Sequence, residues 1–443
     1  MSFSIGTVSE EEHMEQVKQP NRIESLFLGL QHVLAMYSGG VLVPLMIGAA
    51  LQFSATQMAV LISADIFMTG IGTLLQLKQT RFTGIGLPVV IGSAIQTVTP
   101  LVNIGSTLGI GAMYGATIGA GIFVFLIAGI FAKLRRFFPP VVTGSLITVI
   151  GFALVPVAIQ NIGGGDPTAA NFGSPVDLSI ALVTIVTIVL LNIYAKGFMK
   201  AIAVLLGIIV GTIFAAFLGH VSMDAVMDAS WFHLPKPFYM GTPTFHASAI
   251  ITMSVVALTS LIESTGVYFA LADLTGDDLT EKDLTRGYRS EGLAVMLSGI
   301  FSTFPYSTFS QNVGVVRLSG VKSKRPIYFA AVMLMIIGLL PKFGALATTI
   351  PTSALGGAML VLFGTIGIQG ITILHQVDFD QDRNLMIAAL SIGAGIGITV
   401  YPQIFQNLPD LIRLVIENAV VVTSILAVFL NIVIPGRKQE EGA

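Results

Sequence analysis

The sequence predicts an all-α polytopic membrane protein with about 14 transmembrane segments. Three observations support this fold class. Of the 443 residues, 54% are hydrophobic and only 10% are charged, whereas a soluble domain carries about 25% charged residues. Apolar stretches of roughly 20 residues, the length that crosses a bilayer, recur from end to end. Basic residues are distributed unequally between alternate connecting loops, as they are in inserted membrane proteins.

The hydropathy pattern predicts both continuous and interrupted crossings. Continuous apolar segments are expected near 24–47, 56–77, 107–132, 141–162, 178–195, 201–219, 247–272, 284–303, 326–348, 353–374, 384–401 and 414–434. Two further segments, near 88–101 and 305–320, are shorter and are interrupted by Gly, Ser and Pro. These are the third and tenth crossings, and counting them brings the total to about 14.

The distribution of basic residues tests this count. If the N-terminus is cytoplasmic, 18 of the 22 Lys and Arg residues fall in inside loops and tails. The outside loops then hold Lys236, Lys342 and Arg413, while Arg317 lies within a crossing. Because Lys and Arg are retained inside during insertion, the asymmetry predicts an even number of crossings and two cytoplasmic termini. The polar first 20 residues lack the pattern of a cleaved signal peptide.

Composition and motifs exclude several classes of function. A formal net charge of −2 offers no basic surplus for nucleic-acid phosphates. The chain has no cysteine, which removes disulfides and thiolate metal sites. We find no HExxH zinc motif, P-loop or GxSxG nucleophile elbow. We therefore expect no catalytic residues, no metal site and no cofactor.

An internal repeat relates the two halves of the chain. Pro88 begins PVVIGS and Pro305 begins PYSTFS, and each Pro is followed five residues later by a serine, Ser93 or Ser310. The similar offset between 139–144 and 351–356 suggests two homologous halves of seven crossings. Because seven is odd, the second half would be inverted, a recurrent arrangement in secondary transporters. The alternative is coincidence, since Pro-x-x-x-x-Ser alone is a weak pattern.

Glycines recur at helical spacing in one predicted crossing. Gly111, Gly115 and Gly119 are four residues apart. This spacing lets another helix approach closely, so we expect these glycines to serve packing rather than binding.

The two interrupted segments are the best candidates for a binding site. Non-helical backbone has unpaired N–H and C=O groups that lipid cannot satisfy, so it must face protein or a water-filled cavity. We expect an extended stretch after Pro88 and after Pro305, with Ser93 and Ser310 as N-caps of short half-helices. The two helix N-termini would then present amide donors to one ligand near the membrane centre. The alternative is a pair of re-entrant loops with a purely structural role.

Acidic residues within crossings are functional candidates, because an ionisable group at that depth is costly. Glu263, in LTSLIESTGVYFA, lies mid-helix and could accept N–H groups of a ligand or carry a proton. Glu291 could act similarly, or could pair with a nearby Arg at the cytoplasmic side. We expect Asp65 and Glu417 to be structural or interfacial.

Amide and imidazole groups complete the polar set. Gln311 and Asn312 follow Ser310, and a primary amide offers a donor and an acceptor side by side. With the Glu263 carboxylate, such an amide could read the alternating N–H and C=O edge of an oxopurine or oxopyrimidine; alternatively, it caps the half-helix and binds backbone. His32 could bind a proton or be satisfied in the core, with Gln31 beside it about 100° around the helix.

Four motifs in order resemble the nucleobase–ascorbate (nucleobase–cation symporter-2) transporter family, and the resemblance covers essentially the whole chain. The segment FSQNVGVVRLSGV, from Phe309 to Val321, resembles the family signature. GLQHVLAMYSGGVLVP resembles the first-helix Gln-His motif, IGSAIQTVTP the strand–helix of the third segment, and LIESTG the glutamate motif of the eighth helix.

The resemblance implies a homodimer of chains with a 7+7 inverted-repeat fold and proton-coupled transport. It implies short strands in broken segments 3 and 10, a core domain of crossings 1–4 and 8–11, and a gate domain of crossings 5–7 and 12–14. The corresponding limits are a cytoplasmic tail 1–22, core 23–136, gate 137–220, an external loop 221–245, core 246–349, gate 350–435 and a cytoplasmic tail 436–443.

The resemblance also assigns roles to individual residues. Glu263 matches the ligand-binding glutamate and Gln311 the signature position, while Ile95 and Ser310 supply backbone contacts at the half-helix starts. The remaining matches are Gln96 at a polar selectivity position, His32 in the first helix, Glu291 as an acid of the ninth crossing and Phe363 where the gate touches the ligand. We take Asn312 as a further binding residue and Gln31 as a supporting one.

Two details bear on the substrate. Uracil carriers have Glu at the position of Gln311, whereas Gln resembles xanthine and urate carriers. Val267 stands four residues after Glu263, where family members often have His or Asp, so proton coupling would have to use Glu263 or Glu291 without that neighbour.

The sequence therefore predicts a proton-coupled importer of xanthine, or a close oxopurine, in a bacterial-type plasma membrane. Urate, guanine and uracil remain alternative substrates. A different alternative is an anion exchanger on the same architecture, which would need a cation between the half-helices. An intramembrane enzyme would need a nucleophile or metal constellation that the sequence lacks.

Overall fold

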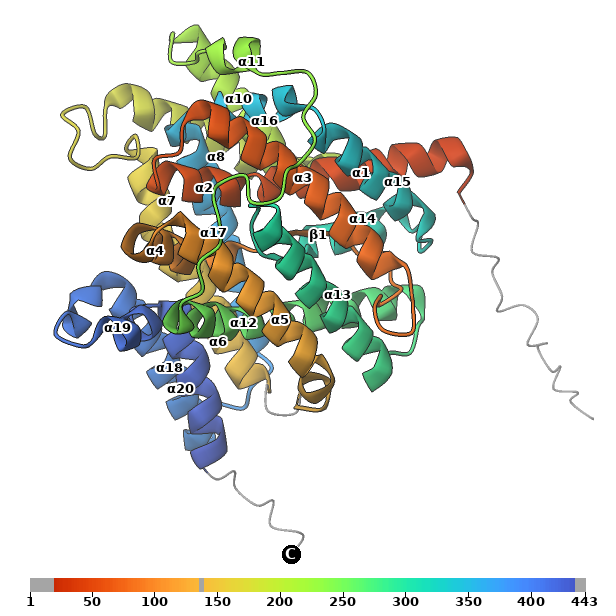
Figure 1. Cartoon of the computed structure of the whole chain (residues 1–443), viewed down its shortest axis with the longest axis vertical. Helices are drawn as coiled ribbons and strands as arrows, with labels where there is room; N and C mark the ends of the chain where they lie inside the picture. The colour runs from red at the N-terminus through yellow and green to blue at the C-terminus, as the bar shows by residue number, and fades with distance from the viewer. Residues whose placement is uncertain (1–19, 135–138, 435–443) are drawn as a thin grey trace, which may run out of the picture.

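The protein is helical nearly throughout. The computed structural model describes residues 20–134 and 139–434, so the expected tails 1–22 and 436–443 lie almost wholly outside the described residues. The helices are α1 (Arg22–Gly40), α2 (Leu42–Ala50), α3 (Ala55–Leu77), α4 (Val98–Leu108), α5 (Ile110–Leu134), α6 (Pro140–Ala153), α7 (Val155–Ile162), α8 (Pro175–Tyr194), α9 (Phe198–Ala201), α10 (Ala203–Phe217), α11 (Asp224–Asp228), α12 (Ala247–Thr275), α13 (Glu281–Ile300), α14 (Ser310–Ser319), α15 (Arg325–Gly338), α16 (Pro341–Thr348), α17 (Thr352–Leu374), α18 (Asp382–Val400), α19 (Asp410–Ile416) and α20 (Ala419–Val433) (Figure 1). Short 3-10 helices η2 (Ile95–Thr97) and η4 (Pro402–Phe405) and strands β1 (Ile91–Ser93) and β2 (Tyr306–Thr308) complete the set.

The described residues include candidate membrane-spanning helices. Eight helices of the described residues are long and apolar enough to cross a bilayer, or nine if the bent pair α15–α16 is one span. α10 and α20 are apolar but shorter. The count of 14 crossings therefore stays a prediction, although helices occupy every segment in which the sequence predicts one.

Local sequence explains where many helices begin and end. Asn21, Ser54 and Thr280 each accept a hydrogen bond from the backbone N–H three residues on, and each forms a capping box. α12 is followed directly by Gly276 and α14 by Gly320, both with positive φ, a conformation that glycine adopts without steric cost. These capping residues define where the helices begin and end, which the length of an apolar stretch alone does not determine.

One expected crossing is not straight. The apolar stretch 326–348 forms two helices that meet at an angle of 81° between Gly338 and Pro341. Proline has no N–H to donate and its ring clashes with the preceding turn, so it begins a new helix rather than continuing one. The sequence interpretation of one continuous segment is wrong here.

Helix contacts fall into two groups. In the first, α5 packs on α13 and α12, and α3 packs on α15, α16 and α13. In the second, α17 packs on α6, α7 and α8, and α18 and α20 pack on α6 and on each other. Contacts between the groups run mainly through α12, with α19 and α20, and through α1 with α10.

Glycines allow the closest approaches within each group. A Cβ added at Gly121 would lie 2.4 Å from the Met296 nitrogen, where α5 crosses α13. A Cβ at Gly151 would lie 2.2 Å from the Gly367 nitrogen, where α6 crosses α17. Small residues let membrane helices pack backbone to backbone, so these pairs behave as rigid units.

The glycines of α5 serve packing, as predicted, against both a helix and a non-helical segment. Gly119 faces the side chain of Ile250 in α12, as expected for a helix contact. Gly111 and Gly115 instead face the backbone of Thr242 and Thr244, in the non-helical segment that leads into α12. Figure 1 shows this segment running across the helices from α11 towards α12.

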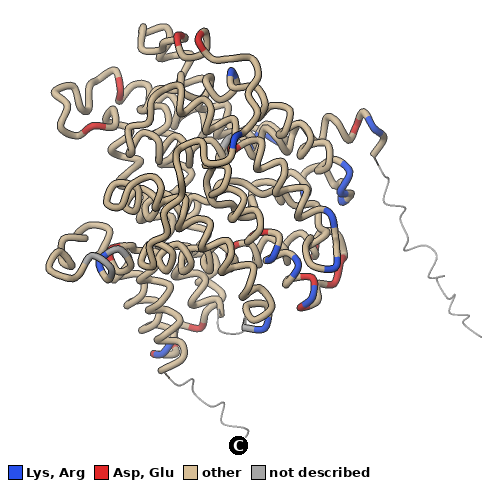
Figure 2. The backbone as a smooth tube through the Cα atoms, in the orientation of Figure 1, with Lys and Arg blue, Asp and Glu red and all other residues tan. Residues whose placement is uncertain are grey.

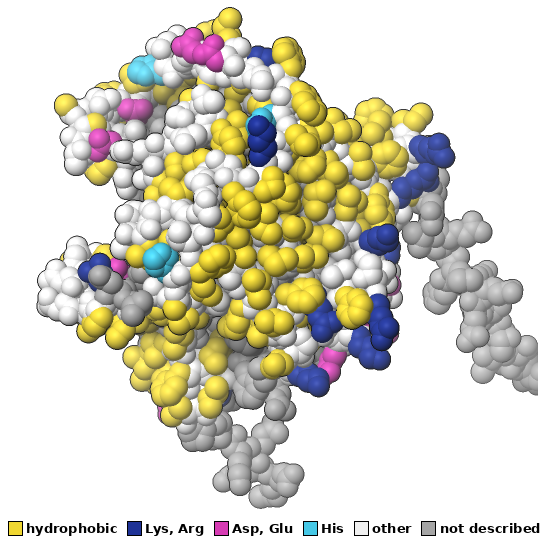
Figure 3. All heavy atoms as spheres, viewed as in Figure 1, with side chains coloured by type: hydrophobic (Ala, Val, Ile, Leu, Met, Phe, Trp, Pro, Cys, Tyr) yellow, Lys and Arg dark blue, Asp and Glu magenta, His cyan; other side chains and the backbone are white. Residues whose placement is uncertain are grey.

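The surface has the character of a membrane protein. Charged residues lie mainly at helix ends and in connecting segments (Figure 2), and hydrophobic side chains cover a broad continuous area of one face (Figure 3). On α8 the exposed apolar side chains are Leu178, Leu182, Val186, Val189, Leu190 and Ile193. Their spacing of three or four residues places most of them on one helix face, suited to lipid.

Candidate functional site

The two interrupted segments meet in the interior, as the sequence predicts. β1 and β2 pair antiparallel, with Ile91 opposite Thr308, Gly92 opposite Ser307 and Ser93 opposite Tyr306. The Ala94 N–H donates to the Pro305 carbonyl at 2.8 Å, and the Phe309 N–H donates to the Val90 carbonyl at 2.9 Å. All three pairs are buried. Both spans are therefore broken helices joined by a short strand ladder.

A short helix starts directly after each strand. η2 and then α4 follow β1, and α14 follows β2. The first N–H groups of a helix have no intrahelical partner and carry a partial positive charge. Because antiparallel strands run in opposite directions, the two helices leave the ladder in opposite directions, and both N-terminal ends lie beside it.

The expected serine N-caps are wrong. Ser93 lies in β1, and its hydroxyl donates to Asp65 Oδ2 at 2.6 Å. Ser310 is the first residue of α14, and its hydroxyl donates to Gln311 Oε1 at 3.3 Å. The N-cap positions are Ala94 and Phe309, and neither makes a side-chain cap bond. This leaves the helix starts without a side-chain acceptor from those two positions.

Glu263 lies beside the first of these helix starts. Its Oε2 accepts a hydrogen bond of 3.1 Å from Gln96 Nε2, and the same Gln96 nitrogen donates to Ser260 Oγ at 2.8 Å. Ser260 and Glu263 are one turn apart on α12, so a single amide spans both. Gln96 is buried and Glu263 half-buried. The carboxylate is thus oriented by an amide and retains an oxygen for another donor.

The second helix start presents a different set of groups. Gln311 is half-buried, and its Oε1 accepts the hydrogen bond from the Ser310 hydroxyl. Asn312 is buried, and its Nδ2 lies 3.2 Å from the His32 carbonyl oxygen and 2.9 Å from His32 Nδ1. Since Asn312 Nδ2 donates to that carbonyl, we assign it as the donor to Nδ1, which places the imidazole proton on Nε2. Asn312 therefore binds α1 through its amide nitrogen, while its Oδ1 is buried and has no hydrogen-bond partner within residues 20–134 and 139–434.

Glu291 is buried behind the ladder rather than paired with an arginine. Tyr268 Oη donates to Glu291 Oε2 at 3.4 Å, and Gln76 Nε2 donates to Tyr268 Oη at 2.8 Å. Ser264 Oγ, on the same helix as Tyr268, accepts the Thr308 N–H of β2 at 3.3 Å. Arg286 instead pairs with Asp283. Glu291 is therefore bonded to α12 through Tyr268, and α12 is bonded to β2 through Ser264.

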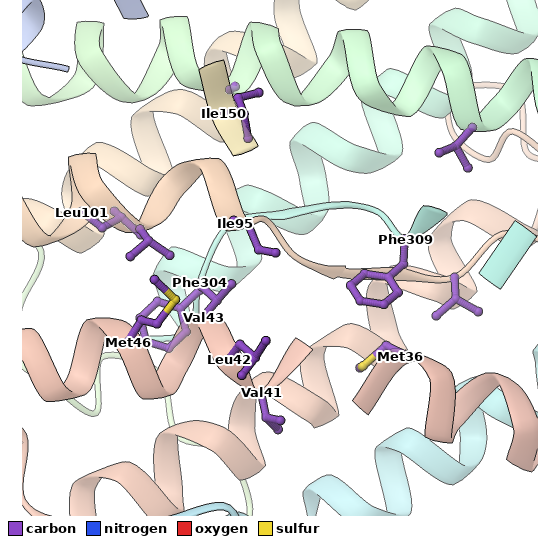
Figure 4. Close-up of a cluster of buried hydrophobic side chains, with 14 of the residues drawn as sticks. Met36, Val41, Leu42, Val43, Met46, Ile95, Leu101, Ile150, Phe304 and Phe309 are labelled. Carbon is purple, nitrogen blue, oxygen red and sulfur yellow. The ribbon is translucent and has the colours of Figure 1, made fainter. Parts of the chain in front are cut away.

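The other candidates occupy the apolar surroundings of the site. Ile95 and Phe309 lie on the two interrupted segments, with Met36 and Leu42 of the first crossing below them in the view (Figure 4). Ile95 and the fully buried Phe363 of α17 belong to one large core cluster. Gln31, on α1 beside His32, is half-buried.

Several polar residues of the site were missed or given little weight from sequence. Ser260 could have been found from its spacing to Glu263, but Gln76 and Tyr268 carry no local signal. Asp65, expected to be structural or interfacial, binds both interrupted segments. Glu417 lies 3.5 Å from Arg413 one turn away on the chain, consistent with an interfacial role.

A cavity of about 470 Å³ reaches the site from the second helix group. Its lining includes Gln96 from the first interrupted segment and Glu417 and Asn418 from the segment before α20. Further polar lining comes from Thr99, Asn103, Thr399, Gln403 and Gln406. The volume exceeds that of a small planar ligand and is within the range of small-molecule sites.

Comparison with known proteins gives consistent matches over the whole chain. A sequence model of a permease family, Xan_ur_permease, matches residues 23–404. The chain is 51% identical to the xanthine permease of Bacillus subtilis, over 93% of each chain. It is 49% identical to the uric acid permease PucK of the same organism, over 94% of this chain and 96% of the relative. The transmembrane domain of a cyanobacterium bicarbonate transporter, BicA, shares the fold with a TM-score of 0.61 and 16% identity, over 94% of this chain and all of that one.

Proposed function

The chain belongs to this permease family, the nucleobase–cation symporter-2 family, and from that membership we propose that it imports an oxopurine, with xanthine as the first candidate, by proton symport. Membership makes the chain a nucleobase transporter and not an enzyme. Relatives named for xanthine and for uric acid are almost equally similar, so uric acid is the main alternative substrate, followed by guanine and uracil.

One observation carries the proposed site: the Glu263 carboxylate, held by Gln96, lies beside the start of one half-helix, while Gln311 lies in the first turn of the other. An oxopurine presents N–H donors and C=O acceptors along its edges. The carboxylate accepts from a ring N–H, whereas the Gln311 amide and the free backbone N–H groups can meet carbonyl oxygens. Ser310 and Ile95 contribute backbone contacts, and Asn312 and His32 hold the second half-helix in place.

The apolar surroundings would enclose the ring faces. Ile95 lies on the first interrupted segment and Phe363 on α17 of the second helix group. A flat heterocycle gains from such contacts in proportion to the apolar area removed from water. In this proposal Phe363 touches the ligand from the gate, and Gln31 supports His32 on α1.

Transport follows from movement of one helix group against the other. The group containing α3, α5 and α13 corresponds to the proposed core, with limits 23–136 and 246–349, and the group containing α6 and α17 to the proposed gate, with limits 137–220 and 350–435. Contacts within each group support rigid-body movement, because close backbone packing resists deformation. The proposal includes about 14 crossings in two inverted halves, cytoplasmic termini, a plasma-membrane location and a homodimer.

Proton coupling would use Glu263 and Glu291. A bare carboxylate is costly to carry across a membrane interior, so protonation or a ligand N–H that neutralises Glu263 would favour the movement. Glu291 accepts from Tyr268 of α12, the helix that carries Glu263, and its Oε1 is buried without a partner among the described residues. Val267 is buried four residues after Glu263, so no titratable group occupies that position.

An anion exchanger is the second candidate, favoured by the shared fold with a bicarbonate transporter. Such a protein needs a cation at the site. Arg317, the basic residue in the signature segment, is exposed and lies at the last turn of α14, away from the helix start. Arg317 therefore does not supply the cation that an anion-binding site needs, and we favour a nucleobase as the substrate.

Uptake by purified protein in liposomes tests the proposal. We expect saturable uptake of radiolabelled xanthine that increases when the outside is acidified and is competed by unlabelled uric acid more strongly than by uracil. Saturable uptake that is independent of the pH gradient would contradict proton coupling but would still support xanthine as a substrate. Flux of chloride or bicarbonate without competition by any nucleobase would replace the proposal by the anion exchanger.

A further inference from the structure

A buried carboxylate that the proposed mechanism does not use ties the two interrupted segments together. Asp65, on α3, is 3% exposed. Its Oδ2 accepts from the Ser93 hydroxyl at 2.6 Å, and its Oδ1 accepts from the Tyr306 hydroxyl at 3.0 Å. The Phe304 N–H also points to Oδ1, at 3.4 Å. One side chain therefore binds residues from both halves of the chain.

The two hydroxyls come from one cross-strand pair. Ser93 and Tyr306 lie opposite each other in the β1–β2 ladder, and directly opposite residues place their side chains on the same face. Asp65 meets this face and receives one bond on each oxygen. The contact is therefore specific for this register of the ladder.

Register matters because the ladder is short. A two-stranded pair of this size is marginal by itself, and a slip of one residue turns every side chain to the opposite face. The same slip would move one half-helix start relative to the other by about 3.3 Å. That displacement exceeds the tolerance of a hydrogen bond, so a rigid ring could no longer contact both helix starts at once.

The placement of Asp65 has a counterpart in the second half of the chain. Asp65 stands ten residues after the first residue of α3, and Glu291 stands ten residues after the first residue of α13. Both acids are buried, α3 packs on β1 and α13 packs on β2, and Asp65 bonds the strands directly. Each of the two helices thus brings one acid to the strands, and Asp65 is bound by three donors.

We propose that Asp65 is a positioning residue for substrate: by holding Ser93 and Tyr306 together, it fixes the distance between the two half-helix starts that bind the oxopurine. This inference rests on the proposed function for the identity of the substrate, but the geometric claim does not depend on it. Asp65 does not touch the ligand, so it sets affinity for all substrates of the site without choosing between them.

The geometric claim is tested with spin labels. The chain has no cysteine, so Thr99→Cys on α4 and Leu318→Cys on α14, both exposed, can be labelled specifically in the full chain. We expect one narrow distance distribution in the parent and a broader or shifted one after Asp65→Asn. The matched control is Ser63→Ala on the same helix, whose buried hydroxyl has no hydrogen-bond partner in the part of the chain that the structure describes, and it should leave the distribution unchanged.

Transport kinetics provide the second readout. Asp65→Asn should raise KM for xanthine and for uric acid by the same factor, about tenfold, with the ratio between them unchanged. Ser93→Ala and Tyr306→Phe each remove one hydroxyl and should give smaller shifts in the same direction, and combining either with Asp65→Asn should add little. These two variants carry the test if Asp65→Asn fails to fold.

The outcomes separate this inference from the proposed function. An unchanged distance distribution with unchanged KM, or a loss of thermal stability alone, would overturn the role of Asp65. A change in the ratio of the two KM values would make Asp65 a specificity residue and would also contradict the proposal. If the parent protein transports no oxopurine, the proposed function fails, and the distance measurement still decides whether Asp65 sets the geometry.

Discussion

The two interrupted segments share a backbone plan but differ in how their side chains are held. At the first, the Gln96 amide is engaged by Ser260 and Glu263 on α12. At the second, Asn312 is tied to His32, while Gln311 bonds its neighbour Ser310 at 3.3 Å. The first side is thus pre-oriented by another helix, and the second exposes an amide that can adjust.

This difference suggests a division of labour. A group that is already oriented loses little entropy when it binds, so the Glu263–Gln96 pair is suited to anchor a feature that all substrates share. An adjustable amide can exchange donor and acceptor by rotation, so Gln311 is suited to read the feature in which substrates differ. Substitutions on the two sides should therefore differ in kind as well as in size.

The largest effect is expected at the anchor. Glu263→Gln keeps the size and the bond from Gln96 but replaces the free carboxylate oxygen by an amide donor that opposes a ring N–H. We expect xanthine uptake to fall at least about 100-fold, with normal membrane expression, because a charged hydrogen bond is lost and a donor faces a donor. Glu417→Gln, at an acid paired with Arg413, is the control and should transport within twofold of the parent. Uptake by Glu263→Gln at the level of the parent would show that the Glu263 carboxylate does not anchor the substrate.

Loss of the orienting amide should come next. Gln96→Leu removes both donors and leaves Glu263 without its partner. We expect KM to rise about 10- to 100-fold for xanthine and uric acid alike, as measured by initial uptake rates. Thr99→Val, at an exposed position that lines the same cavity, is the control. A changed preference between the two purines would show that Gln96 reads substrate differences and would break the division of labour.

The second side should show a smaller shift with a change in preference. Gln311→Ala removes an amide whose side-chain hydrogen bond among the described residues is to its neighbour Ser310, and we expect KM for xanthine to rise about tenfold. The order in which uric acid, guanine and uracil compete should change at the same time, which a competition series measures. An equal loss for every competitor would assign Gln311 to the anchor instead.

The smallest effect is expected behind the second helix start. His32→Phe keeps the ring but removes the nitrogen that accepts from Asn312, while the backbone oxygen of residue 32 remains as the other acceptor. We expect uptake to fall about threefold, because one of two bonds survives. A complete loss of pH-gradient dependence in this variant would instead make His32 part of the proton route.

Sequence reasoning was most successful where a signal is local. Hydropathy predicts the helices because about 20 apolar residues are needed to cross the membrane, and the Gly, Ser and Pro interruptions predict the two broken spans. The capping boxes at Asn21 and Ser54 are also local signals, although the helix limits expected from the sequence do not use them. The 81° bend before Pro341 was missed although proline gives a signal for it, because the flanking apolar residues make one continuous stretch.

Sequence reasoning was weakest where partners are distant in the chain. Asp65 looks isolated in an apolar helix, yet its partners Ser93 and Tyr306 are 28 and 241 residues away. Ser93 was assigned as an N-cap from its place after a Pro, but a strand alternates side-chain direction, and its register decides which partner the serine meets. Only the tertiary arrangement supplies that register.

The most direct test of the central claim is a structure of the protein with xanthine bound, determined in a lipid environment. We predict a flat density beside the β1–β2 ladder, with a ring N–H within hydrogen-bond distance of the Glu263 carboxylate and a ring oxygen near the Gln311 amide or the first N–H groups of α14. Density elsewhere, with the space between the two helix starts occupied only by side chains, would contradict the account.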